Sequence, residues 1–478
     1  MDYLNQLKPF VLISYYVFVS VLIFLIILDN KKPEKSFAYI FLILLFPVGG
    51  ALIYFLLGVQ YHKKKLFTKK RYFNNVYLNT LKENKSVLPE NLKIDSNIKL
   101  PTLFYNIEQV KFTLKNDIQL LINGEEKFPI LIEELKKAKK NIYLDYYIFN
   151  DDQIGTKIIA LLCEKAMTGI EVKIIYDDVG SSISRKNIEK LKKNKVQIFP
   201  YMPVMFSRLA HKANYRNHRK MVIIDNKVGF LGGINISDKY INPNKDQLFW
   251  RDTHLLIKGE AVMDLQYIFI SDWYFVSGQK IKVSDVLYQE NSGIKSNIAT
   301  CVLSSDYGSN SQSIMEAFFG MITSAREEIL ITTPYFLPNE TILNALKITA
   351  KSGVHIKIMI PKKPDIKTAF YASQTYLKSL LESGVEVYYY TKGMMHAKTM
   401  IIDNYICTVG STNMDHRSFN LNAEVNAFII DKTIASQLKL IFENDLKNAY
   451  KLDTNELNNR KWYNKVTCSV ARLFAPVL

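Results

Sequence analysis

Two long apolar stretches lie close together near the amino terminus. Phe10 to Leu28 and Ser36 to Val59 each run without a charged residue, over nineteen and twenty-four positions. A membrane-spanning helix needs about 20 predominantly apolar residues, whereas the apolar region of a cleavable signal peptide has only about 7–15. The pattern therefore predicts a hairpin of two transmembrane helices over residues 1–60.

Lysine and arginine are distributed unequally around this hairpin. Six of them fall within Lys63–Arg71, directly after the second stretch, whereas the short loop between the stretches has three lysines that Asp29 and Glu34 partly offset. The positive-inside rule places both termini and everything after residue 60 in the cytoplasm. The same cluster would be attracted to anionic lipid headgroups, and a solvated topology signal explains it equally well.

Beyond about residue 105, short apolar runs rich in β-branched residues alternate with amphipathic helical segments, which is typical of α/β units. The pattern occurs twice. Ala138–Phe149 resembles Ala325–Phe336, and His218–Asn235 resembles His396–Asn413. The separation of the copies shortens from 187 residues at the first pair to 178 at the second. One duplicated domain with small insertions accounts for this drift.

The repeat divides the rest of the chain. We predict a basic linker at 61–105 and two pseudo-symmetric domains, 106–295 and 296–478, each a mixed β-sheet flanked by helices. The largest insertion precedes the first repeated histidine, at 202–217, where a loop-like segment holds Arg208, Lys212 and Arg216. A functional loop and a neutral insertion are equally compatible with it.

Composition narrows the possible functions. With 48% hydrophobic residues the chain is not disordered in general. Its four cysteines are far apart, which excludes a disulfide framework and a cysteine zinc site and indicates buried thiols in a reducing compartment. The formal net charge of +17 points to an anionic partner: nucleic acid, an acidic membrane surface or an anionic substrate.

The strongest chemical signal is a motif of the form H-x-K-x4-D-x6-G-[GS]-x-N that occurs once in each copy. Its members are His218, Lys220, Asp225, Gly232 and Asn235, and then His396, Lys398, Asp403, Gly410 and Asn413. Residues two apart on a strand point to the same side, so the imidazole and the ammonium of each copy can converge. Two copies face to face would form a cradle for a phosphoryl group. Nothing in the spacing of cysteines or carboxylates suggests a metal.

This duplicated motif resembles the signature of the phospholipase D superfamily. The apolar hairpin with KKP and PVGGALIYFLLG, together with Trp250–His254, Thr333–Phe336 and His416–Glu424, narrows the resemblance to bacterial cardiolipin synthases over essentially the whole chain. The resemblance implies an active site between the two domains. It also implies a multi-pass protein of the bacterial cytoplasmic membrane with its catalytic domain in the cytoplasm.

The resemblance also implies roles for the motif residues in a two-step reaction without cofactor or metal. One histidine attacks phosphorus and the other acts as acid and base. We assign His218 as the nucleophile and His396 as the acid/base, although the symmetric motifs also allow the reverse. Lys220, Lys398, Asn235 and Asn413 would bind the phosphate oxygens. Asp252 and Glu424 would orient the histidine of their own copy, and Asp225 and Asp403 would mainly support the site structurally.

The reaction that this resemblance favours is phosphatidyl transfer between two phosphatidylglycerol molecules, which forms cardiolipin and glycerol. Hydrolysis, or transfer to another acceptor, would use the same chemistry. A membrane-tethered nuclease and a non-enzymatic binding protein fit less well, so we expect phosphatidylglycerol, other anionic phospholipids and the membrane as partners, and no nucleic acid. The tail 461–478 mixes basic and apolar residues, and both an interfacial helix and a helix docked on the domain fit it.

Overall fold

The computed structural model describes residues 2–28, 33–54, 68, 70, 72–74, 99–203, 215–242, 247–281, 293–294, 296–306 and 312–475. The chain divides into a small N-terminal unit, up to Thr68, and a large unit that contains the repeated domains. Each unit has its own apolar cores.

The described part of the N-terminal unit contains the helices α1 (Asp2–Leu28), α2 (Pro33–Leu45) and α3 (Pro47–Ile53). Helices therefore form in both apolar stretches, but the second one is broken at Phe46, which has φ −136° and ψ 77°. The break follows from Pro47, because a proline disfavours helical backbone at the residue before it. Among the residues that the structure describes, no helix meets the length and apolarity that a membrane crossing requires. The crossing stays a prediction.

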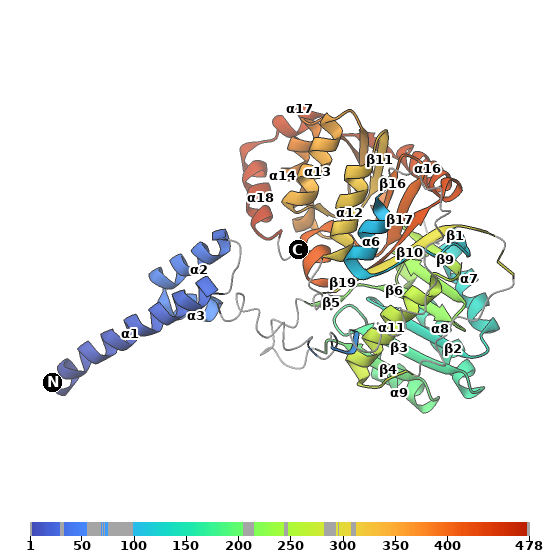
Figure 1. Ribbon diagram of the computed structural model, residues 1–478, viewed down its shortest axis with the longest axis horizontal. Helices are drawn as coiled ribbons and strands as arrows, with labels where there is room; N and C mark the ends of the chain where they lie inside the picture. The colour runs from blue at the N-terminus through green and yellow to red at the C-terminus, as the bar shows by residue number, and fades with distance from the viewer. Residues whose placement is uncertain are drawn as a thin grey trace. The chain divides into compact units, whose positions relative to one another are not determined.

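The large unit contains two large sheets whose strands follow the same order over seven positions, and the second sheet adds β20 at its edge (Figure 1). The first runs β1-β9-β7-β6-β2-β3-β4 and the second β10-β19-β17-β16-β11-β13-β14-β20. The first comprises β1 (Asn116–Ile122), β2 (Asn141–Tyr146), β3 (Glu171–Asp177), β4 (Gln197–Tyr201), β6 (Lys220–Ile224), β7 (Val228–Gly232) and β9 (Thr253–Gly259). The second comprises β10 (Ala299–Ser305), β11 (Glu328–Thr332), β13 (His355–Pro361), β14 (Glu386–Tyr390), β16 (Thr399–Ile402), β17 (Ile406–Gly410), β19 (Asn422–Ile430) and β20 (Ala449–Lys451).

Each sheet is mixed, as predicted. In the first, β2, β3 and β4 pair in parallel, whereas β2, β6, β7, β9 and β1 pair antiparallel. The second repeats this arrangement with β11, β13 and β14 parallel and β11, β16, β17, β19 and β10 antiparallel. The duplicated α/β fold is therefore confirmed.

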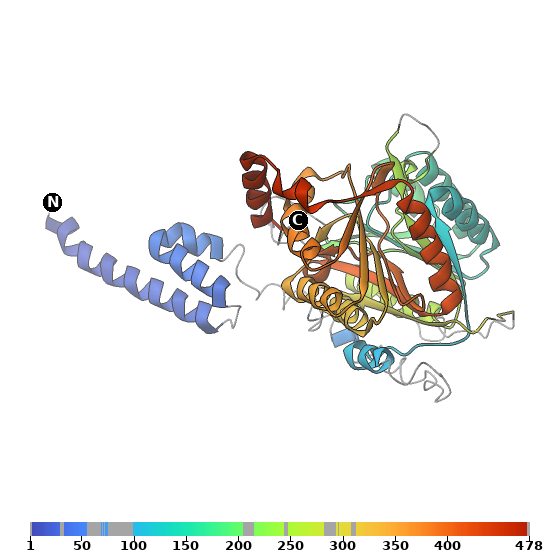
Figure 2. The same ribbon diagram turned by 90° about the horizontal axis from the view of Figure 1, so that it is seen from above.

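Helices pack against both sheets, as Figures 1 and 2 show, and in the first sheet they lie on both faces. The helices of the first repeat are α7 (Asn123–Lys137), α8 (Gln153–Met167), α9 (Arg185–Lys193) and α11 (Val262–Ser277). Those of the second are α12 (Ser313–Ser324), α13 (Glu340–Lys351), α14 (Lys367–Leu381), α15 (His416–Asn420), α16 (Lys432–Leu446), α17 (Thr454–Asn458) and α18 (Trp462–Leu473). Aspartate or asparagine caps several of them. For example, Asp152 accepts a hydrogen bond from the Gly155 N–H at the start of α8.

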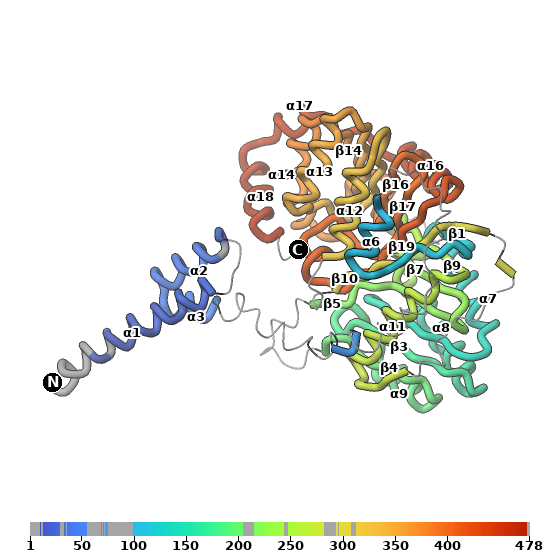
Figure 3. Tube along the Cα trace, viewed as in Figure 1, coloured from blue at the N-terminus to red at the C-terminus, as the bar shows by residue number. Residues whose placement is uncertain are grey.

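Part of the predicted linker 61–105 belongs to the second repeat. Helix α6 (Leu100–Glu108) packs beside α12, which Figure 3 shows as a blue segment among gold ones. Leu100 and Phe104, together with Phe112 after the helix, are buried in the core of the second repeat. Lys70 is also buried, in ion pairs with Asp272 and Asp306. Neither alternative for the basic cluster, contact with headgroups or solvation, therefore holds for Lys70; the other five members of the cluster lie outside the described residues.

Each repeat contributes one short strand that pairs with a strand of the other repeat. Strand β5 (Arg216–Asn217) of the first repeat pairs with the start of β19, and β15 (Gly393–Met395) of the second pairs with β8 (Phe249–Arg251). The predicted loop 202–217 thus ends in a strand, while its residues 204–214, with Arg208 and Lys212, lie outside the described part of the chain. Each exchanged strand directly precedes a motif histidine, so this exchange builds the site.

Candidate active site

The two motif histidines occupy equivalent places at the junction of the repeats. His218 follows β5 and donates its backbone N–H to the Ala423 carbonyl at 2.8 Å, and His396 follows β15 and donates its own to the Arg251 carbonyl at 2.7 Å. Both side chains are buried, with 8% and 7% of each residue exposed. A contact from the opposite repeat therefore fixes the backbone of each histidine.

Each histidine is paired with a carboxylate of the other repeat. His218 Nδ1 lies 2.9 and 3.0 Å from the two oxygens of Glu424, and His396 Nδ1 lies 2.6 Å from Oδ2 of Asp252. The predicted pairing within each copy is therefore wrong. The strand exchange explains the crossing, because Asp252 directly follows β8 and Glu424 lies within β19, the two strands that receive the exchanged segments. With Nδ1 engaged, Nε2 of each imidazole is left for chemistry.

The two motif lysines lie beside the histidines. Lys220 donates to the His218 carbonyl and Lys398 to the His396 carbonyl, both at 2.5 Å, and both lysines are buried. Burial lowers the pKa of Lys220 well below its usual value and that of Lys398 to about 8, while Glu424 and Asp252 oppose the shifts. Each lysine also lowers the pKa of both histidines, so all four groups share one site.

The histidines are neutral at neutral pH. Burial lowers the pKa of His218 to about 4, although Glu424 raises it in part, and burial lowers the pKa of His396 well below its usual value. A neutral imidazole can attack phosphorus, whereas an imidazolium cannot. The site is therefore prepared for nucleophilic chemistry before any substrate binds.

The two carboxylates differ. Burial alone would raise the pKa of Glu424, but His218, Lys220 and a hydrogen bond from Ser411 hold it below its usual value. Burial raises the pKa of Asp252 to about 6, against the opposing effects of Lys398 and the Thr253 N–H. Glu424 is thus firmly ionised, and Asp252 gains a proton in mildly acidic solution. This difference breaks the symmetry that the motifs show in the sequence.

In each copy, the residue after the motif glycine lies against the carboxylate that contacts a motif histidine. Ser411 donates a hydrogen bond to Oε2 of Glu424 at 2.5 Å. In the first copy this position is Gly233, where an added Cβ would lie 2.1 Å from Oδ1 of Asp252. A side chain at 233 would therefore displace the carboxylate that contacts His396. The glycine–serine difference is visible in the sequence. Its effect on the two histidines could not be predicted, because it depends on which carboxylate pairs with which histidine.

The amides of Asn235 and Asn413 are occupied within the protein. Asn235 donates from Nδ2 to the Tyr240 hydroxyl at 2.6 Å and accepts from the Ile148 N–H at 3.1 Å. Asn413 hydrogen-bonds to Asp415 and lowers the pKa of that carboxyl, which burial raises to about 6 overall. Each amide group thus makes a contact within the protein, and a second N–H of each remains, so the phosphate contact of Asn235 and Asn413 stays a prediction.

The motif aspartates lie at the far ends of their strands. Asp225, after β6, accepts hydrogen bonds from the backbone N–H groups of residues 139–141, and Asp403, after β16, accepts them from residues 326–328. Both have positive φ, 52° and 51°. Each aspartate holds the start of its neighbouring central strand, β2 or β11, and neither contacts a motif histidine.

Aromatic rings line the site and were not predicted from the sequence. The ring of Tyr147 lies edge-on to His218 at 4.9 Å, and the rings of Trp250 and Tyr240 lie 5.3 and 5.7 Å from His396. Lys239 stands over Trp250 at 4.4 Å. Trp250 belongs to a quoted sequence segment, whereas Tyr147 and Tyr240 carry no pattern that separates them from core tyrosines.

The other histidines have different places. His254 is buried and accepts from the Ile234 N–H at 3.4 Å, and His355 is exposed at the start of β13. His416 begins α15, and His62 and His211 lie outside the described residues. Over the part of the chain that the structure describes, no cluster of three or more histidines, cysteines or carboxylates could hold a metal ion.

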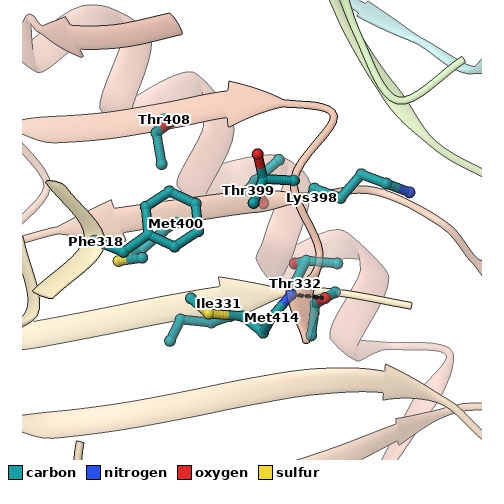
Figure 4. A pocket seen from close by; sticks show the side chains of 10 residues that line it. Phe318, Ile331, Thr332, Lys398, Thr399, Met400, Thr408 and Met414 are labelled. Carbon is teal, nitrogen blue, oxygen red and sulfur yellow. Dashed lines mark hydrogen bonds between the residues drawn. The ribbon is translucent and has the colours of Figure 1, made fainter. Parts of the chain in front are cut away.

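A small cavity of about 10 Å³ lies within the second repeat beside Lys398 (Figure 4). Threonines 332, 333, 399, 408 and 412 contribute to its lining together with Phe318 of α12. In Figure 4 the ammonium of Lys398 points away from the other lining side chains. Neither motif histidine lines this pocket.

The duplicated sheets and the paired motifs at their junction define a protein of the phospholipase D superfamily. A family model described as "Cardiolipin synthase, PLD-like domain" matches residues 131–273 and 318–446, and one described as "Phospholipase_D-nuclease N-terminal" matches residues 16–58. The chain belongs to the cardiolipin synthase family, as the sequence predicted, and it is an enzyme of that family.

Curated relatives extend over nearly the whole chain. A cardiolipin synthase of Geobacillus kaustophilus is 39% identical over 94% of this chain and 90% of its own length. One of Halalkalibacterium halodurans is 38% identical over 97% of this chain and 92% of its own length. Among solved structures, phosphatidylserine synthase of Haemophilus influenzae has a TM-score of 0.63 at 15% identity, covering 80% of this chain and all of that one, which shows a shared fold.

Proposed function

We propose that the protein transfers a phosphatidyl group from one phosphatidylglycerol to another, which forms cardiolipin and releases glycerol. The observation that carries this proposal is the pair of buried, neutral histidines, each held by a carboxylate of the other repeat and flanked by a lysine. The names of the curated relatives agree with this product. The two lysines supply the positive charge that a phosphodiester needs.

In the first step, Nε2 of His218 attacks phosphorus, and the bond from phosphorus to the glycerol oxygen breaks. His396 gives its proton to the departing glycerol. The bound phosphodiester favours the protonated imidazole, because its negative charge counteracts the burial that otherwise lowers the pKa of His396. The products of this step are glycerol and a phosphatidyl group joined to His218.

In the second step, His396 takes the proton from a hydroxyl of the second phosphatidylglycerol, and that oxygen attacks phosphorus. The bond from phosphorus to His218 breaks, and cardiolipin leaves. Lys220 and Lys398 bind the phosphate oxygens in both steps. The carboxylates support this assignment: the ionised Glu424 stabilises positive charge on His218, whereas Asp252, with a pKa of about 6, suits a partner that exchanges protons.

We further propose that the N-terminal unit is embedded in the bacterial cytoplasmic membrane as a helical hairpin and that the large unit is cytoplasmic. Large apolar side chains point outward from its helices: Phe18, Phe24 and Leu28 of α1 and Phe41 of α2 are exposed, as is Val48 of α3 at 82%. An exposed apolar surface of this extent is typical of contact with lipid.

The topology can be tested by labelling single cysteines in intact cells. All four native cysteines are buried in the structure, so they give little background. Asn30→Cys, between the two apolar stretches, should react with a membrane-impermeant maleimide added outside the cells, and Lys351→Cys, at the end of α13, should react only after lysis. Reaction of both from outside would contradict the proposed orientation.

The reaction is tested by giving the purified, detergent-solubilised protein labelled phosphatidylglycerol and separating the lipids. Cardiolipin with an equal amount of glycerol is expected, with and without EDTA. Phosphatidic acid as the sole product would replace transfer by hydrolysis, and loss of activity in EDTA would contradict the metal-free mechanism. His218→Ala and His396→Ala should abolish turnover, whereas His355→Ala, a change at an exposed histidine, should not.

A further inference from the structure

Helix α18 lies at the outer edge of the second repeat beside α14 (Figure 1). It belongs to the tail 461–478, for which the sequence allowed either an interfacial helix or a helix docked on the domain. Its inner side carries small buried residues. Cys468 and Ala471 of the helix are buried, and Ala471 and the following Ala475 pack with Leu337 and Ala369. The helix is therefore docked on the domain by a narrow stripe of small side chains.

The outer side of the same helix exposes large apolar side chains. Trp462 is 75% exposed and Leu473 72%, and Val466, Val470 and Phe474 are about half exposed. They recur every three or four positions, so they form one stripe along the helix. Because the stripe points away from the docked residues, folding of the domain leaves it uncovered.

Basic residues lie along one side of this stripe. At 100° per residue, Lys461, Lys465 and Arg472 fall between the docked face and the outer apolar stripe. The segment 461–478 contains no aspartate or glutamate. A helix that combines an outward apolar stripe, a tryptophan and flanking cations matches an anionic lipid surface, where the apolar side chains enter the acyl boundary and the cations contact headgroups.

The carboxyl end of α18 lies close to the His396 side of the site. Tyr335 packs against the Ala471–Ala475 cluster, and its hydroxyl donates to Asp365 at 2.5 Å. The charge of Asp365 in turn acts on both His396 and Lys398. A surface that covers α18 therefore lies beside the rim of the catalytic site.

We propose that α18 lies in the headgroup region of an anionic leaflet and holds the His396 side of the site against it. This inference rests on the proposed function, because it supposes that the substrate enters from that leaflet. The helix then provides a second attachment, independent of the N-terminal unit, which presents the site to phosphatidylglycerol headgroups.

The three tryptophans of the chain provide a direct test. Trp250 and Trp273 are buried, whereas Trp462 is the most exposed part of the stripe. The full-length protein would be reconstituted in vesicles of phosphatidylglycerol and phosphatidylcholine, with and without brominated acyl chains. Brominated lipid should quench a component of the emission that Trp462→Phe removes. If that component is quenched by aqueous acrylamide and not by brominated lipid, α18 does not contact the membrane.

A functional test uses the double variant Val466→Asp, Val470→Asp, with Leu440→Asp as the matched control, since Leu440 is a similarly exposed apolar residue on α16. Turnover of long-chain phosphatidylglycerol in vesicles should fall about tenfold or more in the double variant. In the same double variant, turnover of a short-chain, water-soluble phosphatidylglycerol should stay within about twofold of the wild-type rate. In the Leu440→Asp control, turnover of both lipids should stay within about twofold of the wild-type rates.

The outcomes separate the two proposals. An equal loss on both substrates assigns α18 a purely structural role, and no loss on either shows that the stripe is not used; each overturns the inference. If the wild-type protein converts neither lipid, the proposed function fails, and the quenching of Trp462 still decides whether α18 contacts the membrane.

Discussion

The substitution Glu424→Gln removes one negative charge from a fully buried position and leaves the size of the side chain unchanged. Both carboxylate oxygens of Glu424 face Nδ1 of His218, at 2.9 and 3.0 Å, and Ser411 and Asn422 donate to them as well. The oxygen of the substituted amide can still accept hydrogen bonds, whereas its NH₂ group cannot accept any. It cannot stabilise the positive charge that develops on His218 when this imidazole bonds to phosphorus.

The magnitude follows from the burial of this pair. Removing the charge of one partner from a buried, hydrogen-bonded ion pair costs about 3–5 kcal/mol, and every 1.4 kcal/mol is about tenfold in rate. Glu424→Gln should therefore slow formation of the phosphatidyl-enzyme about 10²–10⁴-fold. In contrast, Asp252→Asn should mainly slow the steps in which His396 transfers protons.

The assay is a single-turnover measurement with excess enzyme and phosphatidylglycerol labelled in the terminal glycerol, so that glycerol release reports the first step. Glu386→Gln is the matched control, because Glu386 is a partly exposed glutamate on β14 that pairs with Lys451. Glycerol release by Glu424→Gln within about threefold of the wild-type rate would refute the reasoning, as would a larger first-step loss in Asp252→Asn.

Three further predictions rest on charged side chains that the fold holds in place. Lys70→Met removes the ammonium that pairs with the buried Asp272 and the half-buried Asp306; because Asp272 keeps its ion pair with Arg219, the free energy of unfolding measured in urea should fall by about 1–3 kcal/mol. Asp225→Ala leaves backbone N–H groups at the start of β2 without an acceptor and should lower the unfolding midpoint, whereas kcat per folded molecule, from active-site titration, stays within about threefold. The pH profile of kcat/KM should be bell-shaped, because activity falls as Asp252 gains a proton below its pKa of about 6 and as Lys398 loses one above its pKa of about 8; a flat profile from pH 5 to 9 would contradict both roles.

Much of the fold could be predicted because the sequence pattern of one domain occurs twice in the chain. The motif strands β6 and β16 could be predicted from their runs of apolar residues. Because the histidine precedes each strand and the aspartate follows it, the length of the strand separates Asp225 and Asp403 from the histidines. The break of the second apolar stretch at Phe46 has a local cause in Pro47, although the apolar pattern alone predicts one continuous helix there.

Features that depend on distant contacts could not be predicted. The crossed pairs His218–Glu424 and His396–Asp252 depend on exchanged strands only two and three residues long, which are too short to give a periodic signal. Lys70 belongs to a run of basic residues, and its burial depends on Asp272, 202 positions away. In both cases the partner that decides the environment lies in another part of the chain.

The proposed assignment of the nucleophile is tested most directly by locating the phosphatidyl group on the enzyme. The His396→Ala variant would be incubated with radiolabelled phosphatidylglycerol and denatured at mildly alkaline pH, where a phosphorus–nitrogen bond is stable. The protein would then be digested and the labelled peptide sequenced by mass spectrometry. The site geometry predicts a single phosphorus–nitrogen adduct on His218, absent from His218→Ala. An adduct on His396 in His218→Ala, with none on His218 in His396→Ala, would contradict the assignment.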